Sequence, residues 1–201
     1  MTTWVFLYGM LACSSEIDGK PAATVGNSTV QGSNAAENKA VATQGDTTLS
    51  LHSDSKIEWV GNNLKSDHTG GFKDIKGTAI VGKEGNLKSV NADINILSLF
   101  SDNKKLTRHL LNEDFFFSSK YAKATFKSSS ITEKNIKGNL EMRGITKEIE
   151  FPATVAVATD KVTLTGEFTI NRKLWGINYA GAADNLIKDD VLIKLDVTYA
   201  K

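Results

Sequence analysis

Apolar and polar residues alternate along most of this chain, and the alternation limits the possible folds more than any other feature of the sequence. It runs through residues 90–96, 136–142, 162–170 and 191–199. Successive side chains of a strand point to opposite faces of a sheet, so each stretch predicts a strand with one buried and one solvated face. One-sided strands of this kind are typical of antiparallel sheets.

The number of such stretches favours a domain built almost entirely of β structure. About eight strands are expected between Thr47 and Lys201. The continuous apolar strands and long amphipathic helices that a parallel sheet requires are missing from the sequence. Eight one-sided strands predict a sandwich or a closed barrel, and a barrel of that size can hold one small ligand. Gly138 and Gly166 lie among large inward-facing residues, which is consistent with a cavity or with the taper of a packed barrel.

The sequence also predicts one short helix and one interrupted strand. The helix runs from about Asp102 to Leu111, with Asp102 as its N-cap and with Leu106, Leu110 and Leu111 on its apolar side. Pro152 cannot donate a backbone hydrogen bond, so we expect it at a sheet edge or a bulge.

The chain begins with an apolar run that has the size of the hydrophobic region of an export signal. The stretch WVFLYGMLAC, Trp4 to Cys13, is shorter than the roughly 20 residues of a membrane-spanning helix. Its end resembles a bacterial lipobox, whose cysteine carries a lipid, although Met10 replaces the usual leucine and no Lys or Arg precedes the run. We expect an export signal over residues 1–13, a lipid anchor on Cys13 and a periplasmic or membrane-anchored protein of the bacterial envelope. Ordinary cleaved export and a buried native segment are the alternatives.

Residues 14–46 have the composition of a linker. They are rich in Ser, Asn, Ala, Gly and Thr and contain no aromatic residue. Such a segment buries too little apolar surface to offset the entropy lost on ordering, so we expect a flexible tether before a folded domain over residues 47–201.

The charge and cysteine content exclude some classes of protein. The 24 basic and 23 acidic residues leave a net charge of +1, and the basic residues do not cluster, so nucleic-acid binding is not expected. Cys13 is the only cysteine, which rules out an intrachain disulfide.

Residues that could serve catalysis are few and scattered. They are His68, His109, Glu113, Asp114 and Arg172. The sequence contains neither an HExxH nor a GxSxG motif, so no metal site or serine nucleophile is expected. An envelope enzyme acting on a lipid-like substrate is an alternative that would need His68 or His109 as a base.

Structural roles explain the same residues better than catalysis does. His68 precedes a glycine pair and is expected to fix a turn, and His109 is expected to join the helix to the barrel. Arg172 is expected to pair with a carboxylate such as Asp74 or Asp114, or else to lie at the polar head of a ligand.

Four segments carry a resemblance to a known family. They are WVGNNLKSDHTGGFKDIKG (59–77), INILSLFSDNKKLTRHLLNEDFFFSSKYAKATF (94–126), IKGNLEMRGITKEIEFP (136–152) and FTINRKLWGINY (168–179). In this order and spacing they resemble the bacterial YceI-like polyisoprenoid-binding family, over nearly all of residues 47–201.

The resemblance implies both a fold and a function. It implies a lipocalin-like, eight-stranded antiparallel β-barrel with one short helix. The barrel interior would hold a long isoprenoid lipid, such as a polyprenyl chain or a quinone tail, which the protein carries or sequesters without catalysis. A barrel that acts only as a scaffold is the other alternative, and a homodimer through a paired edge strand is left open. Where the family commonly has Asp and Pro, this chain has Phe117 and Ala122, so we expect a more apolar mouth.

Three consecutive phenylalanines cannot all lie on one surface of a strand or helix. We expect Phe115 and Phe117 to face the cavity and Phe116 to pack between barrel wall and helix, or the reverse, while a dry plug made of all three is the alternative. No cofactor is expected apart from the bound lipid. The candidate ligand-binding residues are Trp59, Phe72, Ile94, Ile96, Leu99, Leu110, Phe115, Phe117, Phe126, Leu140, Phe168, Ile170, Arg172 and Trp175.

Overall fold

The computed structural model describes residues 15–26, 42–63, 66–158, 160–179 and 187–201. Its strands are β1 (Thr24–Val25), β2 (Thr47–Leu51), β3 (Lys56–Asn62), β4 (Asp67–Phe72), β5 (Ile75–Val81), β6 (Leu87–Asn95), β7 (Leu99–Ser101), β8 (Lys123–Ile131), β9 (Asn135–Met142), β10 (Ile145–Pro152), β11 (Thr154–Val157), β12 (Lys161–Asn171) and β13 (Asp190–Ala200). The helices are α1 (Lys104–Leu110) and two 3-10 turns, η1 (Ile96–Ser98) and η2 (Arg172–Trp175).

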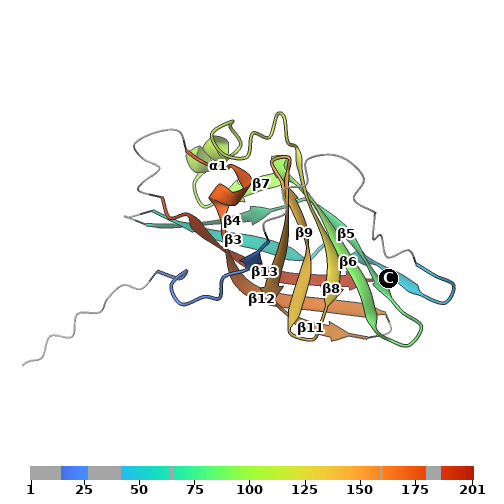
Figure 1. The fold of residues 1–201 in the computed structure, drawn as a ribbon. Coiled ribbons are helices and arrows are strands. Elements are labelled where there is room, and N and C mark those ends of the chain that lie inside the picture. The colour runs from blue at the N-terminus through green and yellow to red at the C-terminus, as the bar shows by residue number, and fades with distance from the viewer. Residues whose placement is uncertain (1–14, 27–41, 64–65, 159, 180–186) are drawn as a thin grey trace, which may run out of the picture.

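The described strands form one antiparallel sheet that curls into a barrel, with α1 over one end of it (Figure 1). Neighbouring strands follow the order β1-β10-β9-β8-β6-β5-β2-β13-β3-β4-β7, and β12 lies between β13 and β11. The prediction of an all-β barrel with one short helix is confirmed, and the sandwich is excluded.

The strand count differs from the sequence prediction because long strands bend. The sheet has 13 strands among the described residues, whereas about eight were expected. β2 and β3 pair with opposite ends of β13, and short bends likewise divide β4 from β5, β6 from β7 and β10 from β11. Each of these four pairs is one strand interrupted by a bend, so the alternation identified the continuous strands but not the interruptions.

The alternating residues face inward as predicted. Val90, Ala92 and Ile94 of β6 are buried, and Asn91 and Asp93 between them are more exposed. The buried residues of successive strands meet in one large apolar cluster inside the barrel. Burial of each large apolar side chain contributes roughly 1.5–3 kcal/mol, so this cluster is the main source of stability.

The predicted helix exists but begins later than expected. Asn103, rather than Asp102, is the N-cap of α1, because its Oδ1 accepts hydrogen bonds from the backbone N–H groups of Lys105 and Leu106 at 2.8 and 3.2 Å. The Asp102 carboxylate instead accepts a hydrogen bond from the Thr69 N–H at 3.2 Å.

Part of the expected linker lies against the barrel. Thr24–Val25 forms β1 on the edge of β10, and Ala22 forms a parallel bridge with Thr169 of β12. Ile17 packs on the outer wall against Val60 and Leu192. These contacts place residues 22–25 in the barrel wall and Ile17 on its outer face. The predictions for the export signal, for Cys13 and for residues 27–41 fall outside the described residues.

Candidate functional site

An elongated apolar cavity of about 260 Å³ occupies the interior of the barrel. Along β13, the residues at every second position from Val191 to Tyr199 line it. Eight residues of strand span about 26 Å at roughly 3.3 Å each. A volume of 260 Å³ over that length is a narrow bore, which fits a chain better than a compact molecule.

Most of the candidate ligand-binding residues lie on this bore. The candidates that line it are Trp59, Phe72, Ile94, Ile96, Leu110, Phe115, Phe126, Leu140, Phe168, Ile170 and Arg172. Leu99, Phe117 and Trp175 do not line it. Leu99 is buried on β7, and Trp175 is fully buried beside the cavity, where its Nε1 donates to the Leu140 carbonyl at 3.2 Å.

The three phenylalanines are arranged differently from both expected arrangements. Phe115 and Phe116 both line the cavity, and the Phe116 ring packs edge-on against Phe72 with centroids 6.3 Å apart. Phe117 points away and packs against Tyr121 at 5.9 Å.

A turn, rather than a strand or helix, explains this arrangement. The Phe116 and Ser118 N–H groups donate to the carbonyls of Leu110 and Leu111, which folds the segment back onto the end of α1. Phe117 has a left-handed backbone with a φ of 49°, and this reverses the direction of its side chain. Phe116 is therefore a lining residue that strand or helix periodicity could not identify.

Glycines allow two aromatic rings to lie flat on the wall. A Cβ at Gly70 would lie 2.4 Å from Cζ2 of Trp59, and a Cβ at Gly138 would lie 2.6 Å from Cζ of Phe126. Each ring therefore occupies the place where a side chain would otherwise stand. Both rings add apolar surface to the wall and leave the bore open.

The polar lining residues of one end gather around the β3–β4 hairpin. They are Asn62, Asn63, His68 and Arg172. Asn63 forms a bridge with Ile187, and the Asn62 carbonyl accepts a hydrogen bond from the Lys188 N–H at 2.8 Å. We call this the polar end of the cavity for these residues, although their polar groups bond to protein and almost all of the cavity surface is formed by carbon atoms.

At the opposite end, Tyr199 is the main polar group. Its hydroxyl donates to the Asn91 carbonyl at 3.0 Å, and burial raises the pKa of Tyr199 well above its ordinary value. The hydroxyl therefore stays protonated and satisfied, so this end remains effectively apolar.

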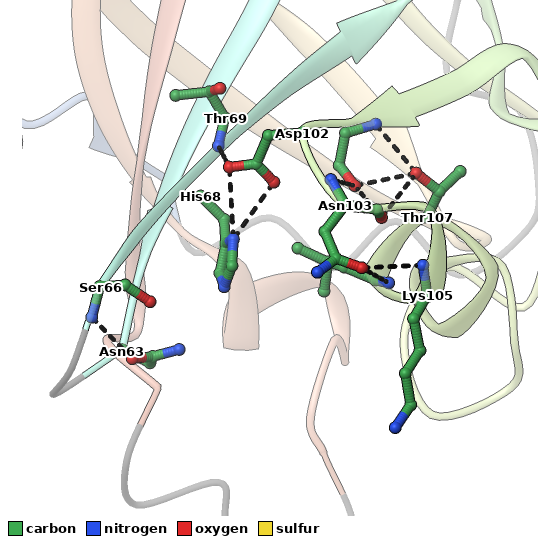
Figure 2. Close-up of polar contacts among 10 residues, drawn as sticks. Asn63, Ser66, His68, Thr69, Asp102, Asn103, Lys105 and Thr107 are labelled. Carbon is green, nitrogen blue, oxygen red and sulfur yellow. Dashed lines mark hydrogen bonds and ion pairs between the residues drawn. The ribbon is translucent and has the colours of Figure 1, made fainter.

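His68 is held in place by a carboxylate, as Figure 2 shows. Its Nδ1 lies 3.2 Å from Oδ1 of Asp102, and the Asp102 carboxylate is itself fixed by the Thr69 N–H at 3.2 Å. His68 lies within β4, so the prediction that it fixes a turn is wrong. Because Asp102 holds one ring nitrogen, the imidazole keeps a fixed orientation on the cavity wall.

His109 does not line the cavity, and its contacts hold α1 against neighbouring aromatic residues. Its ring packs edge-on against Phe115 and Tyr179 at 5.0 and 5.2 Å, and its Nε2 lies 3.9 Å from Oδ2 of Asp114. The Glu113 carbonyl accepts a hydrogen bond from Arg143 at 2.8 Å. The catalytic candidates therefore have separate structural partners.

Arg172 is buried and clamps the backbone at the polar end. Its guanidinium donates to the carbonyls of Ile177, Lys188 and Ile187 at 2.6, 3.3 and 3.4 Å, and it pairs with Asp189 at 3.5 Å. The prediction that Arg172 pairs with a carboxylate is confirmed, but the partner is Asp189, which directly precedes β13, rather than Asp74 or Asp114.

Trp59 contributes a buried donor beside the cavity. Its Nε1 has no hydrogen-bond partner among the described residues, and a buried unsatisfied donor costs about 1–3 kcal/mol.

Sequence reasoning missed several lining residues besides Phe116. The alternation of Ile149 and Phe151 in β10 would have found both, and Leu106 was identified only as part of the helix.

The described residues contain neither a cluster of metal-ligating side chains nor a membrane-spanning helix. No cluster of three or more His, Cys, Asp or Glu side chains there could hold a metal ion. In that same part of the chain, no helix has the length and apolar character needed to cross a membrane.

Comparison with known families places residues 48–199 on the model of the YceI-like domain. The chain is 30% identical over 139 residues to the UPF0312 protein SA2479 of Staphylococcus aureus strain N315, a match that covers 65% of this chain and 81% of the relative. It is 32% identical over 118 residues to the UPF0312 protein Sputw3181_1309 of Shewanella sp. strain W3-18-1, covering 53% and 62%.

Solved structures share the fold. Burkholderia cenocepacia BcnA matches with a TM-score of 0.64 at 24% identity, over 72% of this chain and 95% of that protein. A polyisoprenoid binding domain from Saccharophagus degradans, implicated in plant cell wall breakdown, matches with a TM-score of 0.59 at 13% identity, over 78% and 98%. At these identities the similarity establishes the barrel fold.

Proposed function

This chain belongs to the YceI-like family, and we propose on that premise that its barrel binds a long-chain isoprenoid lipid, either a polyprenyl chain or a quinone tail. The observation that carries the proposal is the narrow apolar bore that follows β13 from Val191 to Tyr199. The name of the S. degradans neighbour, a polyisoprenoid binding domain, supports the same ligand class.

The cavity has room for a segment of such a ligand. An engineered apolar cavity of about 150 Å³ in another protein holds benzene, and the cavity here is about 260 Å³. Each isoprene unit has five carbons, so at about 0.8 kcal/mol per CH₂-sized group its transfer from water contributes up to about 4 kcal/mol. The lipid otherwise rests in a membrane and loses freedom on binding, so the preference over a bilayer is modest.

The polar end of the cavity orients the ligand. The apolar chain lies along the bore, and the head lies among Asn62, Asn63 and His68. A quinone or a prenol, with one polar head on an apolar chain, fits this arrangement.

The role is that of a carrier or a sequestering protein rather than an enzyme. The Asp102 carboxylate orients His68, but His109 and Arg172 are occupied by structural partners. The apolar interior therefore supports binding without a chemical step.

The test is native mass spectrometry of the gently purified full chain, followed by solvent extraction of what it releases. A stoichiometric isoprenoid is expected, and the same spectrum gives the oligomeric state. A barrel that is empty and also refuses added quinones and polyprenols would remove this function.

The proposed location is the bacterial cell envelope, with residues 1–13 as export signal and a lipid on Cys13. The apolar run from Trp4 to Cys13 supports it. Labelled palmitate should be incorporated by the native chain and not by Cys13→Ser. An unlabelled native chain would exclude the lipid anchor.

A further inference from the structure

The barrel wall has a seam where β10 and β12 separate. At one end of the barrel, β11 pairs directly with β12 from Thr154 to Val157. Next to it, a Cβ at Gly166 of β12 would lie 2.7 Å from the Pro152 carbonyl of β10, so the two strands are in contact there. Beyond this point β10 pairs with β1 and β9, and no described pairing joins it to β12.

Residues 21–26 fill this seam as a short strand. On the β12 side, the Ala23 N–H donates to the Thr169 carbonyl at 2.8 Å and the Thr169 N–H donates to the Pro21 carbonyl at 2.9 Å. On the β10 side, Thr24 and Val25 pair with Glu150 and Ile149. This segment, Pro21–Gly26, is hereafter called the strap.

The strap closes the sheet directly behind residues that line the cavity. Ile149 of β10 and Phe168 and Ile170 of β12, on the two sides of the seam, all line the cavity. The strap turns Ala23 and Val25 toward the same apolar core. Removal of the strap would therefore leave only these lining side chains between the cavity and the solvent, and their movement would open the cavity sideways.

The strap is held more weakly than its neighbours. Its strand, β1, has two residues, whereas β10 and β12 have eight and 11. Outside the seam it is secured by Ile17 and by surface ion pairs such as Lys188–Asp18 at 3.0 Å, and exposed pairs add little stability. The strap also lies outside residues 48–199, the span of the family domain, so the barrel acquires it from an N-terminal extension.

We propose that the strap is a removable wall strand and that the seam it fills is a lateral portal through which an apolar ligand enters the cavity. The identity of that ligand rests on the proposed function, but the opening of the seam does not. A lateral portal lets a chain-like molecule enter along its length. The molecule then does not have to pass α1 and the aromatic turn formed by Phe115, Phe116 and Phe117, which cover one end of the barrel.

The first test is hydrogen exchange at two adjacent amides of β12. The Thr169 N–H donates to the strap, and by strand alternation the Ile170 N–H points to β13. If the strap leaves the seam, Thr169 exchanges at least about tenfold faster than Ile170. Equal, slow exchange at the two amides would show that the strap is a fixed part of the wall and would overturn the proposal.

The second test locks the strap with a disulfide. Thr24 and Glu150 are paired and exposed, so the full chain with Cys13→Ser, Thr24→Cys and Glu150→Cys can be closed by oxidation and reopened by reduction. The uptake of 1-anilinonaphthalene-8-sulfonate and of a naphthoquinone with four isoprene units is followed by fluorescence. Oxidation should slow uptake by about tenfold or more, and reduction should restore it.

A matched disulfide elsewhere controls for general stiffening. Thr125→Cys and Glu141→Cys, also with Cys13→Ser, join β8 to β9, which are already paired along their lengths. This lock should leave uptake unchanged. Equal uptake by the oxidised and reduced strap variants would exclude the portal. If the strap gates the sulfonate but the quinone does not bind, the portal stands and the proposed ligand fails.

Discussion

The Phe151 and Phe168 rings stack 4.3 Å apart and nearly parallel, across the point at which β10 and β12 begin to separate. Both side chains are buried and both line the cavity. The stack therefore joins the two edges of the seam from the inside. It gives the barrel wall a fixed point next to the strap.

Removal of either ring should cost stability, and the two losses should not add. Phe151→Ala and Phe168→Ala are each expected to lower the free energy of unfolding by about 3–5 kcal/mol. Because the rings contact each other, the double variant should lose less than the sum, by about 0.5–1.5 kcal/mol. Urea unfolding of the four proteins of this cycle measures the difference. Strict additivity would mean that the stack itself contributes nothing.

The glycines that contact the Trp59 ring give a second prediction. Gly70 is the test position, and Gly61, which lies near the same ring, is the matched control. A Cβ at Gly70 would lie 2.2 Å from the Phe100 carbonyl, which is backbone and cannot move aside, whereas a Cβ at Gly61 would make an ordinary contact 3.6 Å from Trp59. Gly70→Ala should therefore destabilise the protein by about 1–3 kcal/mol or more.

Gly61→Ala should change the free energy of unfolding by less than about 1 kcal/mol. Thermal unfolding of the two variants, each also carrying Trp4→Phe and Trp175→Phe so that Trp59 is the remaining emitter, compares them. Equal losses would show that the ring does not depend on Gly70.

Much of the fold could be predicted because the signal that specifies it is local and periodic. The alternation in β6 and β13 follows from burial on one face, and this pattern is visible in the sequence without knowledge of partners. The same alternation identified most of the cavity wall, since inward-facing residues line the cavity.

The features that were missed depend on contacts distant in sequence or on irregular backbone. The strap is too short to show a period, and the polar composition of residues 14–46 resembles a linker. Its place depends on the unpaired edges of β10 and β12, more than 120 residues away along the chain. The cap of α1 moved from Asp102 to Asn103 because Asp102 is held by Thr69. The local sequence shows neither the distant strands that hold the strap nor the contact between Asp102 and Thr69.

Acid should weaken the attachment of the loop before β2. The Asp46 carboxylate accepts hydrogen bonds from the Thr43 N–H at 2.8 Å and from Lys88 Nζ at 2.9 Å, and these contacts lower the pKa of Asp46 to about 2. A carboxyl whose folded pKa lies below its unfolded value of about 3.9 stabilises the fold above that value, and the contribution is lost as the pH falls toward 2.

Asp46→Asn removes this contribution at every pH. The variant should be less stable than the native protein at pH 6, and the gap should narrow between pH 4 and pH 2. Urea midpoints at several pH values measure the gap. A gap that stays constant down to pH 2 would mean that Asp46 does not titrate with folding.

Two variants in the aromatic turn should distinguish an effect on ligand affinity from an effect on stability. Phe116 lines the cavity, and Phe117, the next residue, packs outside it against Tyr121. Phe116→Ala should therefore weaken the binding of a naphthoquinone with four isoprene units about tenfold, equivalent to about 1.4 kcal/mol of lost apolar contact. Phe117→Ala keeps the left-handed backbone at that position and removes a comparable ring, so it should lower stability without changing the affinity.

Affinity is measured by titration and stability by urea unfolding, on the same preparations. A loss of affinity in both variants would show that the turn acts as a unit, and a loss in neither would show that the ligand does not reach this end of the cavity. A selective loss in Phe116→Ala is the expected result, because only that ring faces the bore.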